Sequence, residues 1–254
     1  MLSGVASPPV EPNDALWDRI QIEQAEIFDS SRARVHHLAR AVRQHGPVLN
    51  IGIGAGYLEQ ELIGWGTPVH TIDPSARSVA MLQEKIGLGD EIRVGRAEQL
   101  PFASDFFGAV VVAEVLEHLT TPVLRQALAE IHRVLRPRGF IIGTVPAREN
   151  LAAQTVDCPT CQCHFHRWGH YQSFNRDSMR SLLAETFSVD EVFERPFVCW
   201  RTLNWVGRLA AAVKMGLYYL GRHGSSENVV FRASKTPARQ AILQQRHSAD
   251  PLAV

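Results

Sequence analysis

The chain alternates between short runs of branched apolar residues and longer segments in which apolar residues recur every three or four positions. The short runs predict strands at residues 48–51, 69–72, 91–94, 109–112, 140–144, 188–193 and 228–233. Residues 109–112, Ala-Val-Val-Val, lack polar alternation, which is typical of a parallel strand buried on both faces. The longer segments predict helices at residues 17–28, 32–44, 58–63, 75–86, 122–135, 176–187 and 205–220. This order predicts an α/β fold with a doubly wound, mostly parallel sheet and helices on both faces.

The pattern divides the chain into three parts. Residues 1–30 are expected to form a tail and one helix, which either covers a ligand site as a lid or, more simply, packs on the sheet. Residues 31–234 are predicted to form one domain, interrupted by an insert at about residues 150–174. Residues 235–254 are polar and are predicted to be a disordered tail.

The composition is that of an ordinary globular protein, with 45% hydrophobic and 20% charged residues. Lys plus Arg and Asp plus Glu both number 26, so the formal net charge is zero and we expect no general binding to nucleic acid. The first residues lack a basic segment followed by an apolar core, and no apolar span has transmembrane length. We therefore expect a cytoplasmic protein without stable membrane insertion.

A glycine turn is the strongest local motif. The segment Val48-Leu-Asn-Ile-Gly-Ile-Gly-Ala-Gly56 joins a buried strand to a helix through three glycines at alternate positions. Glycine lets the backbone pass close to a ligand, and the N-terminus of the following helix favours polar or anionic ligand groups. Asp73 ends the next predicted strand, where nucleotide-binding sheets carry an acid for ribose hydroxyls. A dinucleotide fingerprint would place the third glycine at Tyr57, so that class of enzyme is the less favoured interpretation.

Four blocks of sequence together resemble class I S-adenosylmethionine-dependent methyltransferases that act on small molecules. In order they are Val48–Gly56, Ile72-Asp-Pro-Ser75, Gly95-Arg-Ala-Glu-Gln-Leu-Pro-Phe102, and Glu114-Val-Leu-Glu-His-Leu119 followed by Val134-Leu-Arg-Pro-Arg-Gly-Phe140. One block alone is a weak signal, whereas four in this order and spacing are specific. The resemblance implies a Rossmann-like sheet of seven strands with the last strand antiparallel.

The resemblance also implies S-adenosyl-L-methionine as cofactor, a small-molecule acceptor and a set of binding residues. The glycine turn would pass under the methionine part, Asp73 would hold the ribose, Ala97 and Glu98 would lie beside the adenine, and Glu114 would face the methionine end. The cofactor residues implied in this way are Asn50, Gly52, Gly54, Gly56, Asp73, Pro74, Ala97, Glu98 and Glu114.

Two positions depart from the family pattern. Asn50 stands where the family usually has an acid before the first glycine, and Arg96 stands where it often has Asp. These departures motivate an alternative function, in which a degenerate methyltransferase fold binds a partner through a zinc loop.

His118 is the predicted catalytic residue, because it follows the fourth strand, where the acceptor pocket of the family begins, and because histidine titrates near neutral pH. The alternative is that His118 has a structural role, as a histidine at a helix end that is hydrogen-bonded to backbone groups. Glu117 could likewise be either functional or structural. Methyl transfer also depends strongly on alignment, so a general base is not required.

The insert carries a cluster of cysteines and histidines with metal-site spacing. A tight turn brings two thiolates together and two imidazoles complete a tetrahedron, which is the closed site that structural zinc prefers. The predicted ligands are Cys158, Cys161, His166 and His170, with Cys163 and His164 as alternatives. A surface loop with free thiols is the other interpretation. Since the insert follows the fifth strand, we expect it to help shape the acceptor pocket, with Trp168, Tyr171 and Phe174 as candidate lining residues.

The helix predicted at residues 205–220 is strongly apolar but too short to span a bilayer. The main expectation is a core helix or the face of a homodimer. A helix that lies on a membrane surface or holds a lipid-like acceptor is the alternative.

Overall fold

The computed structural model describes residues 29–157, 162–222, 224 and 227–235 of the chain. The predicted helix at residues 17–28, the C-terminal tail, and both Cys158 and Cys161 lie outside these residues.

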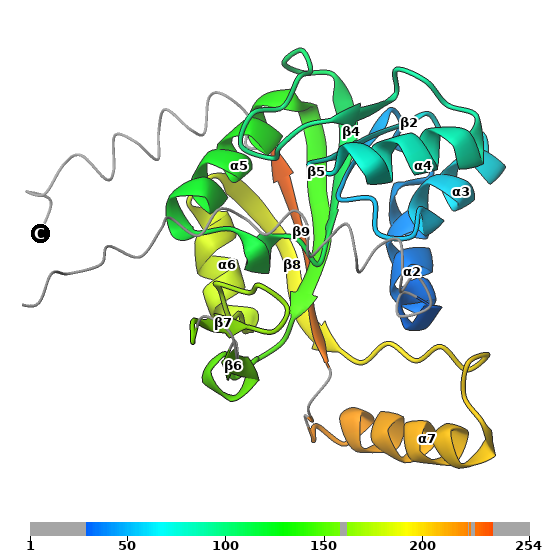
Figure 1. Cartoon of the computed structure of the whole chain (residues 1–254), viewed down its shortest axis with the longest axis vertical. Coiled ribbons are helices and arrows are strands. Elements are labelled where there is room, and N and C mark those ends of the chain that lie inside the picture. The colour runs from blue at the N-terminus through cyan, green and yellow to red at the C-terminus, as the bar shows by residue number, and fades with distance from the viewer. Residues whose placement is uncertain (1–28, 158–161, 223, 225–226, 236–254) are drawn as a thin grey trace, which may run out of the picture.

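A seven-stranded sheet forms the centre of the molecule, with the order β3-β2-β1-β4-β5-β9-β8 (Figure 1). The antiparallel strand β9 lies between β5 and β8, and the other six strands run parallel to one another. This arrangement confirms the predicted seven-stranded sheet. The strands are β1 Val48–Ile51, β2 Val69–Asp73, β3 Ile92–Val94, β4 Phe107–Ala113, β5 Leu135–Pro146, β8 Phe187–Arg195 and β9 Asn228–Lys235.

Helices cover both faces of the sheet. The α-helices are α2 Arg32–Val42, α3 Tyr57–Gly64, α4 Ala76–Ile86, α5 Thr121–Val134, α6 Arg176–Ala184 and α7 Trp205–Tyr219, and the 3-10 turns are η2 Leu116–His118 and η3 Ala152–Gln154. Ser75 caps α4 as predicted, because its side chain accepts a hydrogen bond from the Ser78 amide.

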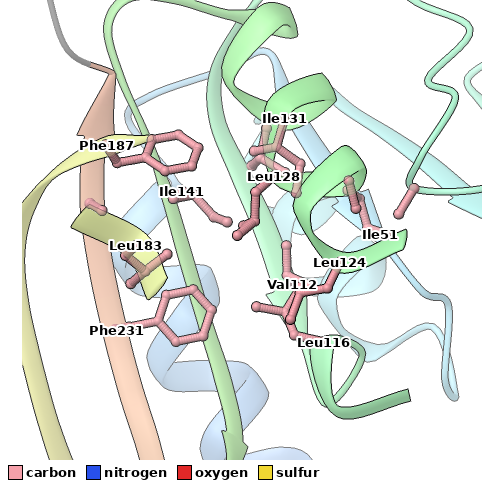
Figure 2. Close-up of a cluster of buried hydrophobic side chains, with 14 of the residues drawn as sticks. Ile51, Val112, Leu116, Leu124, Leu128, Ile131, Ile141, Leu183, Phe187 and Phe231 are labelled. Atoms are coloured by element: carbon pink, nitrogen blue, oxygen red, sulfur yellow. The ribbon is translucent and has the colours of Figure 1, made fainter. Parts of the chain in front are cut away.

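Side chains alternate between two cores along the central strands. Val110 and Val112 of β4 pack with α5 and α6 in the larger core, part of which Figure 2 shows. Ala109 and Val111 of the same strand pack on the opposite side with Leu38 of α2. This explains why the central strand has no polar positions, since both of its faces are buried.

Three elements differ from the prediction. Strand β5 begins at Leu135 rather than Phe140, because Leu135 pairs with Phe107 before a register shift. The insert contains a short hairpin of β6 Thr155–Asp157 and β7 His164–His166 that the sequence pattern does not predict. The expectation that residues 205–220 form a core helix is wrong, since none of the residues of α7 is buried.

Candidate active site

The main pocket lies at the carboxyl ends of the central strands. The strand order reverses between β1 and β4, and ligands of open α/β sheets bind at such a switch point. The cavity has a volume of about 510 Å³. All predicted cofactor residues except Gly56 line it, and so does His118. The structure thus brings together residues from four blocks that are far apart in the sequence.

The glycine turn requires glycine for two different reasons. Gly52, Gly54 and Gly56 have φ angles of 88°, 55° and 72°, in the left-handed region that favours glycine. A Cβ atom on Gly52 would come within 2.9 Å of Val115 Cγ2 at the pocket wall. A Cβ atom on Gly56 would instead lie 2.5 Å from Leu82 Cδ1, so Gly56 allows α3 and α4 to pack closely and lies outside the pocket lining.

Asp73 connects the end of β2 to the glycine turn. Its Oδ2 accepts a hydrogen bond from the Ile53 amide and its Oδ1 accepts one from the Ser75 amide, both at 2.9 Å. The carboxylate is nearly buried and lines the pocket. Each carboxylate oxygen has a second lone pair, so both remain able to accept from ligand hydroxyls.

Asn50 is explained by a buried acid on α3. The amide nitrogen of Asn50 donates to Glu59 Oε1 at 2.6 Å and to the Gly52 carbonyl at 3.0 Å. The Thr71 hydroxyl also donates to Glu59, whose pKa is raised by burial. An acid at position 50 would place a second carboxyl group against Glu59, whereas the amide supplies a donor. The chain therefore keeps a buried acid under the glycine turn, on α3 instead of β1.

Glu114 projects from the end of β4 with a left-handed φ of 57°, a conformation that costs energy for a residue other than glycine. Its Oε1 accepts from the Asn228 amide at 3.0 Å, and its Oε2 lies 3.6 Å from an Arg34 nitrogen. Arg34 also lines the pocket. The sequence analysis missed Arg34, because nothing in the pattern of α2 distinguishes it from a solvent-facing cation.

Two titratable residues of η2, Glu117 and His118, lie at the other end of the pocket. Glu117 is 1% exposed and neither carboxyl oxygen has a hydrogen-bond partner among the described residues. Burial, reinforced by the negative charge of Glu114, raises the pKa of Glu117 well above its ordinary value. Burial, followed by the proximity of His170, lowers the pKa of His118 to about 3. His118 is therefore a neutral imidazole at physiological pH.

The insert is attached to η2 by hydrogen bonds. The amides of Tyr171 and Gln172 both donate to the Glu117 carbonyl, at 2.7 and 3.1 Å. His118 Nδ1 lies 3.3 Å from the Gly169 carbonyl, to which it donates, since a carbonyl only accepts. These contacts bring Trp168 and His170 to the pocket lining, whereas Tyr171 stays exposed and Phe174 packs in the core.

Glu149 joins the two histidines that were predicted as metal ligands. Its Oε2 lies 2.5 Å from His170 Nδ1, and its Oε1 lies 3.4 Å from His166 Nε2. The two imidazole rings stack with their centroids 4.6 Å apart. His164 instead pairs with Asp157 on the exposed hairpin, and Cys163 is exposed. The sequence analysis missed Glu149, although its position just after β5 places it at the ligand edge of the sheet.

Part of the chain matches a known protein family. Residues 49–143 match the family model described as a methyltransferase domain. A stretch of 116 residues is 28% identical to the ubiquinone biosynthesis O-methyltransferase of Azorhizobium caulinodans, covering 42% of this chain and 45% of the relative. Another of 151 residues is 31% identical to a ubiquinone/menaquinone biosynthesis C-methyltransferase of Pectobacterium atrosepticum, covering 49% and 59%. The chain thus spans less than two thirds of the length of either relative.

Solved structures share the fold over most of the chain. A Burkholderia thailandensis 1,6-didemethyltoxoflavin N1-methyltransferase with bound S-adenosylhomocysteine superposes with a TM-score of 0.61 at 16% identity, covering 92% of this chain and 94% of that one. The [4+2]-cyclase SpnF superposes with a TM-score of 0.56 at 18% identity, covering 92% and 99%. Residues 49–143 therefore match a methyltransferase domain, and the chain shares the Rossmann-like fold of methyltransferases of known structure.

Proposed function

We propose that the protein transfers a methyl group from S-adenosyl-L-methionine to a small-molecule acceptor. The observation that carries this proposal is the convergence of four sequence blocks on one pocket of about 510 Å³ at the topological switch point. This volume is within the range of small-molecule sites. The cofactor supplies an electrophilic methyl group when bound.

Each end of the pocket has its own task in this proposal. Asp73 accepts hydrogen bonds from the ribose hydroxyls, and Arg34 and Glu114 offer opposite charges to the amino-acid part of the cofactor. His118 is a neutral imidazole, so it orients an acceptor by hydrogen bonding better than it removes a proton. Alignment of the acceptor supplies the rest of the rate.

Calorimetric titration with S-adenosylhomocysteine tests the cofactor site. We expect Asp73→Ala to weaken binding about 10- to 100-fold, because two hydrogen bonds to a charged acceptor are lost. Asp90→Ala, at an exposed carboxylate on the protein surface, is the control and should leave the affinity unchanged. Absence of binding by the folded wild-type protein would remove the proposal.

A measurement of methyl transfer distinguishes the proposed methyltransferase from the alternative, a degenerate binding module. The [4+2]-cyclase neighbour shows that this fold also occurs in a protein named for a different reaction, so fold alone does not establish methyl transfer. Incubation with methyl-labelled cofactor and a panel of phenols, enols and amines should yield a labelled product. Cofactor binding without transfer to any acceptor, together with a protein partner lost in a Cys158→Ser/Cys161→Ser variant, would favour the binding module.

We also propose that the insert binds one structural zinc ion through Cys158, Cys161, His166 and His170. Two observations support this set. The described half of it, His166 and His170, lies together with stacked rings, and His166 Nε2 is buried without a hydrogen-bond partner among the described residues. A closed zinc site would order a loop that has little apolar core of its own. Glu149 is a competing third ligand, because its carboxylate contacts a nitrogen of each imidazole.

Elemental analysis of protein prepared without a metal-affinity tag tests the zinc site. We expect about one zinc per chain for the wild type and for Glu149→Gln, and none for Cys158→Ser/Cys161→Ser. If Glu149→Gln lost zinc and the double serine variant kept it, the Glu149 carboxylate would be a ligand in place of the two thiolates. A wild-type protein that is stably folded and contains no metal would contradict the proposal.

A further inference from the structure

Helix α7 presents its most apolar face to solvent. Trp205 and Leu220, at its two ends, are 77% and 79% exposed. Other large apolar side chains between them are also exposed, and those on the same side are Val206, Leu209, Val213 and Leu217. Since successive residues of an α-helix are about 100° apart, these six side chains span about 120° of the helix surface. An exposed apolar stripe of this kind marks an interaction surface.

The opposite side of α7 is the one that faces the protein. The half-buried positions of the helix are Gly207, Ala211, Lys214, Met215 and Tyr218, and they fall on a single arc. In Figure 1 the helix stands at the edge of the molecule, joined to β8 by an extended connection. The apolar stripe therefore lies on the side of α7 away from its half-buried positions, and none of the described residues buries it.

The charges around the stripe have one sign. Residues 195–226 contain Arg195, Arg201, Arg208, Lys214 and Arg222 and no Asp or Glu. Arg208 and Lys214 each lie about 60° beyond one edge of the stripe, on opposite sides of it. Long cationic side chains at the borders of an apolar face can reach lipid headgroups while the apolar side chains enter the acyl region. Aromatic residues, which favour the same interface, stand near both ends at Trp205 and Tyr219.

A groove beside α7 carries the same chemistry. It has a volume of about 510 Å³, and no Asp or Glu occurs in its lining among the described residues. Arg40 of α2 and Arg195 at the end of β8 supply cations, while Phe197, Trp200 and Met215 supply apolar surface. Cations beside apolar side chains suit the phosphate of an anionic lipid, and Met215 places this groove next to the protein-facing side of α7.

We propose that α7 and this groove dock the protein on the surface of a membrane that contains anionic lipids. The helix has 15 residues and is about 22 Å long, too short to cross a bilayer core of about 30 Å, so it lies in the plane of the interface. None of the described helices is long and apolar enough to cross a membrane. A second copy of the chain is the less suitable occupant, because a two-fold contact would face Arg208 and Lys214 with the same cations and no acid.

Vesicle flotation with the full chain tests this proposal, and it does not depend on methyl transfer. We expect binding to vesicles of phosphatidylcholine and phosphatidylglycerol, weaker binding at high salt, and little binding to phosphatidylcholine alone. Leu209→Glu should weaken binding at least about tenfold, because a charge is placed in the middle of the apolar stripe. Met81→Glu, on the exposed surface of α4, is the matched control and should bind like the wild type.

Two further measurements decide the outcome. Circular dichroism and S-adenosylhomocysteine affinity should be unchanged in Leu209→Glu, and Trp205→Phe should lose the blue shift of fluorescence that vesicles cause in the wild type. Equal binding by Leu209→Glu and the wild type would overturn the proposal, as would absence of vesicle binding. The proposal would also be overturned if the wild type formed a dimer, did not bind vesicles, and became monomeric in Leu209→Glu. The stripe would then contact a second copy of the chain.

Discussion

The two ends of the pocket are built on opposite electrostatic principles. At the glycine turn, the buried Asp73 and Asn50 have their hydrogen bonds supplied by backbone amides, a backbone carbonyl and Glu59. At η2, the buried Glu117 has no partner for either carboxyl oxygen among the described residues, and His118 is held neutral. Asp73 and Asn50 are held in place by these hydrogen bonds, whereas Glu117 is destabilised by burial without a partner.

This difference indicates which end of the pocket binds the cofactor and which end takes part in the reaction. Partnered polar groups hold a cofactor in a defined place with little reorganisation. Buried titratable groups with shifted pKa values reduce the stability of the fold, and such groups concentrate at reactive sites. The insert joins the second end only, through the Glu117 carbonyl and the pair of His170 with Glu149. Changes at the glycine turn should therefore affect affinity, and changes at η2 should affect stability and turnover.

The largest effect is expected from Gly52→Ala. The added methyl group would lie 2.9 Å from Val115 Cγ2, on a backbone with φ of 88°. We expect S-adenosylhomocysteine affinity to fall by about 100-fold or more, because the turn must shift at the point where the cofactor passes. Gly64→Ala, where nothing lies within 4 Å of the new Cβ atom, is the control. Equal affinities in calorimetry would show that the turn does not contact the cofactor.

Glu117→Gln should separate stability from function. A raised pKa in the folded state means that the contribution of Glu117 to stability is complete below pH 4.5 and is lost as the pH rises through the folded pKa. The variant should therefore be more stable than the wild type at pH 8, by up to about 1.4 kcal/mol for each pKa unit of the shift. Denaturant unfolding at pH 8 and pH 4.5 measures this, and methyl transfer should fall. A variant that is less stable at pH 8 would contradict the proposed cost of the buried acid.

The smallest expected effect is the loss of stability that His118 causes in mildly acidic solution. Its pKa falls from 6.5 to about 3 on folding, so the unfolded chain binds the proton more readily and stability falls as the pH drops through 6.5. Between pH 8 and pH 6 this costs the wild type about 0.8 kcal/mol by proton linkage. His118→Gln should lack this loss, so the difference in stability between the two proteins should change with pH. Parallel unfolding curves at both pH values would place the histidine in solvent.

Much of the cofactor end was predictable from the sequence, because its signals are local. Three glycines, a strand and an acid at the end of the next strand are read from neighbouring residues, and the parallel sheet then brings the strand ends together. Asn50 is the exception. Its explanation required Glu59, which lies nine positions away and approaches it only because α3 folds back over β1.

The acceptor end was predicted less completely, since its chemistry depends on burial and on contacts between distant segments. Glu117 and His118 were recognised as candidates, but their pKa shifts in opposite directions follow from desolvation, which sequence spacing does not report. The predicted metal ligands His166 and His170 do lie together. The Glu149 carboxylate that contacts both imidazoles, however, belongs to a residue about twenty positions earlier in the sequence. The proposed zinc site stays a prediction, because Cys158 and Cys161 lie outside the described residues.

The sequence by itself determined the succession of strands and helices along the chain, the glycine turn and the acid at Asp73, because apolar periodicity and glycine conformation are properties of adjacent residues. Only the tertiary structure decided which apolar helix is covered. Residues 205–220 are more apolar than the segment that forms α5, but α5 meets the sheet and α7 does not. Burial depends on what packs against a surface, and a pattern of residues along one segment does not contain that partner.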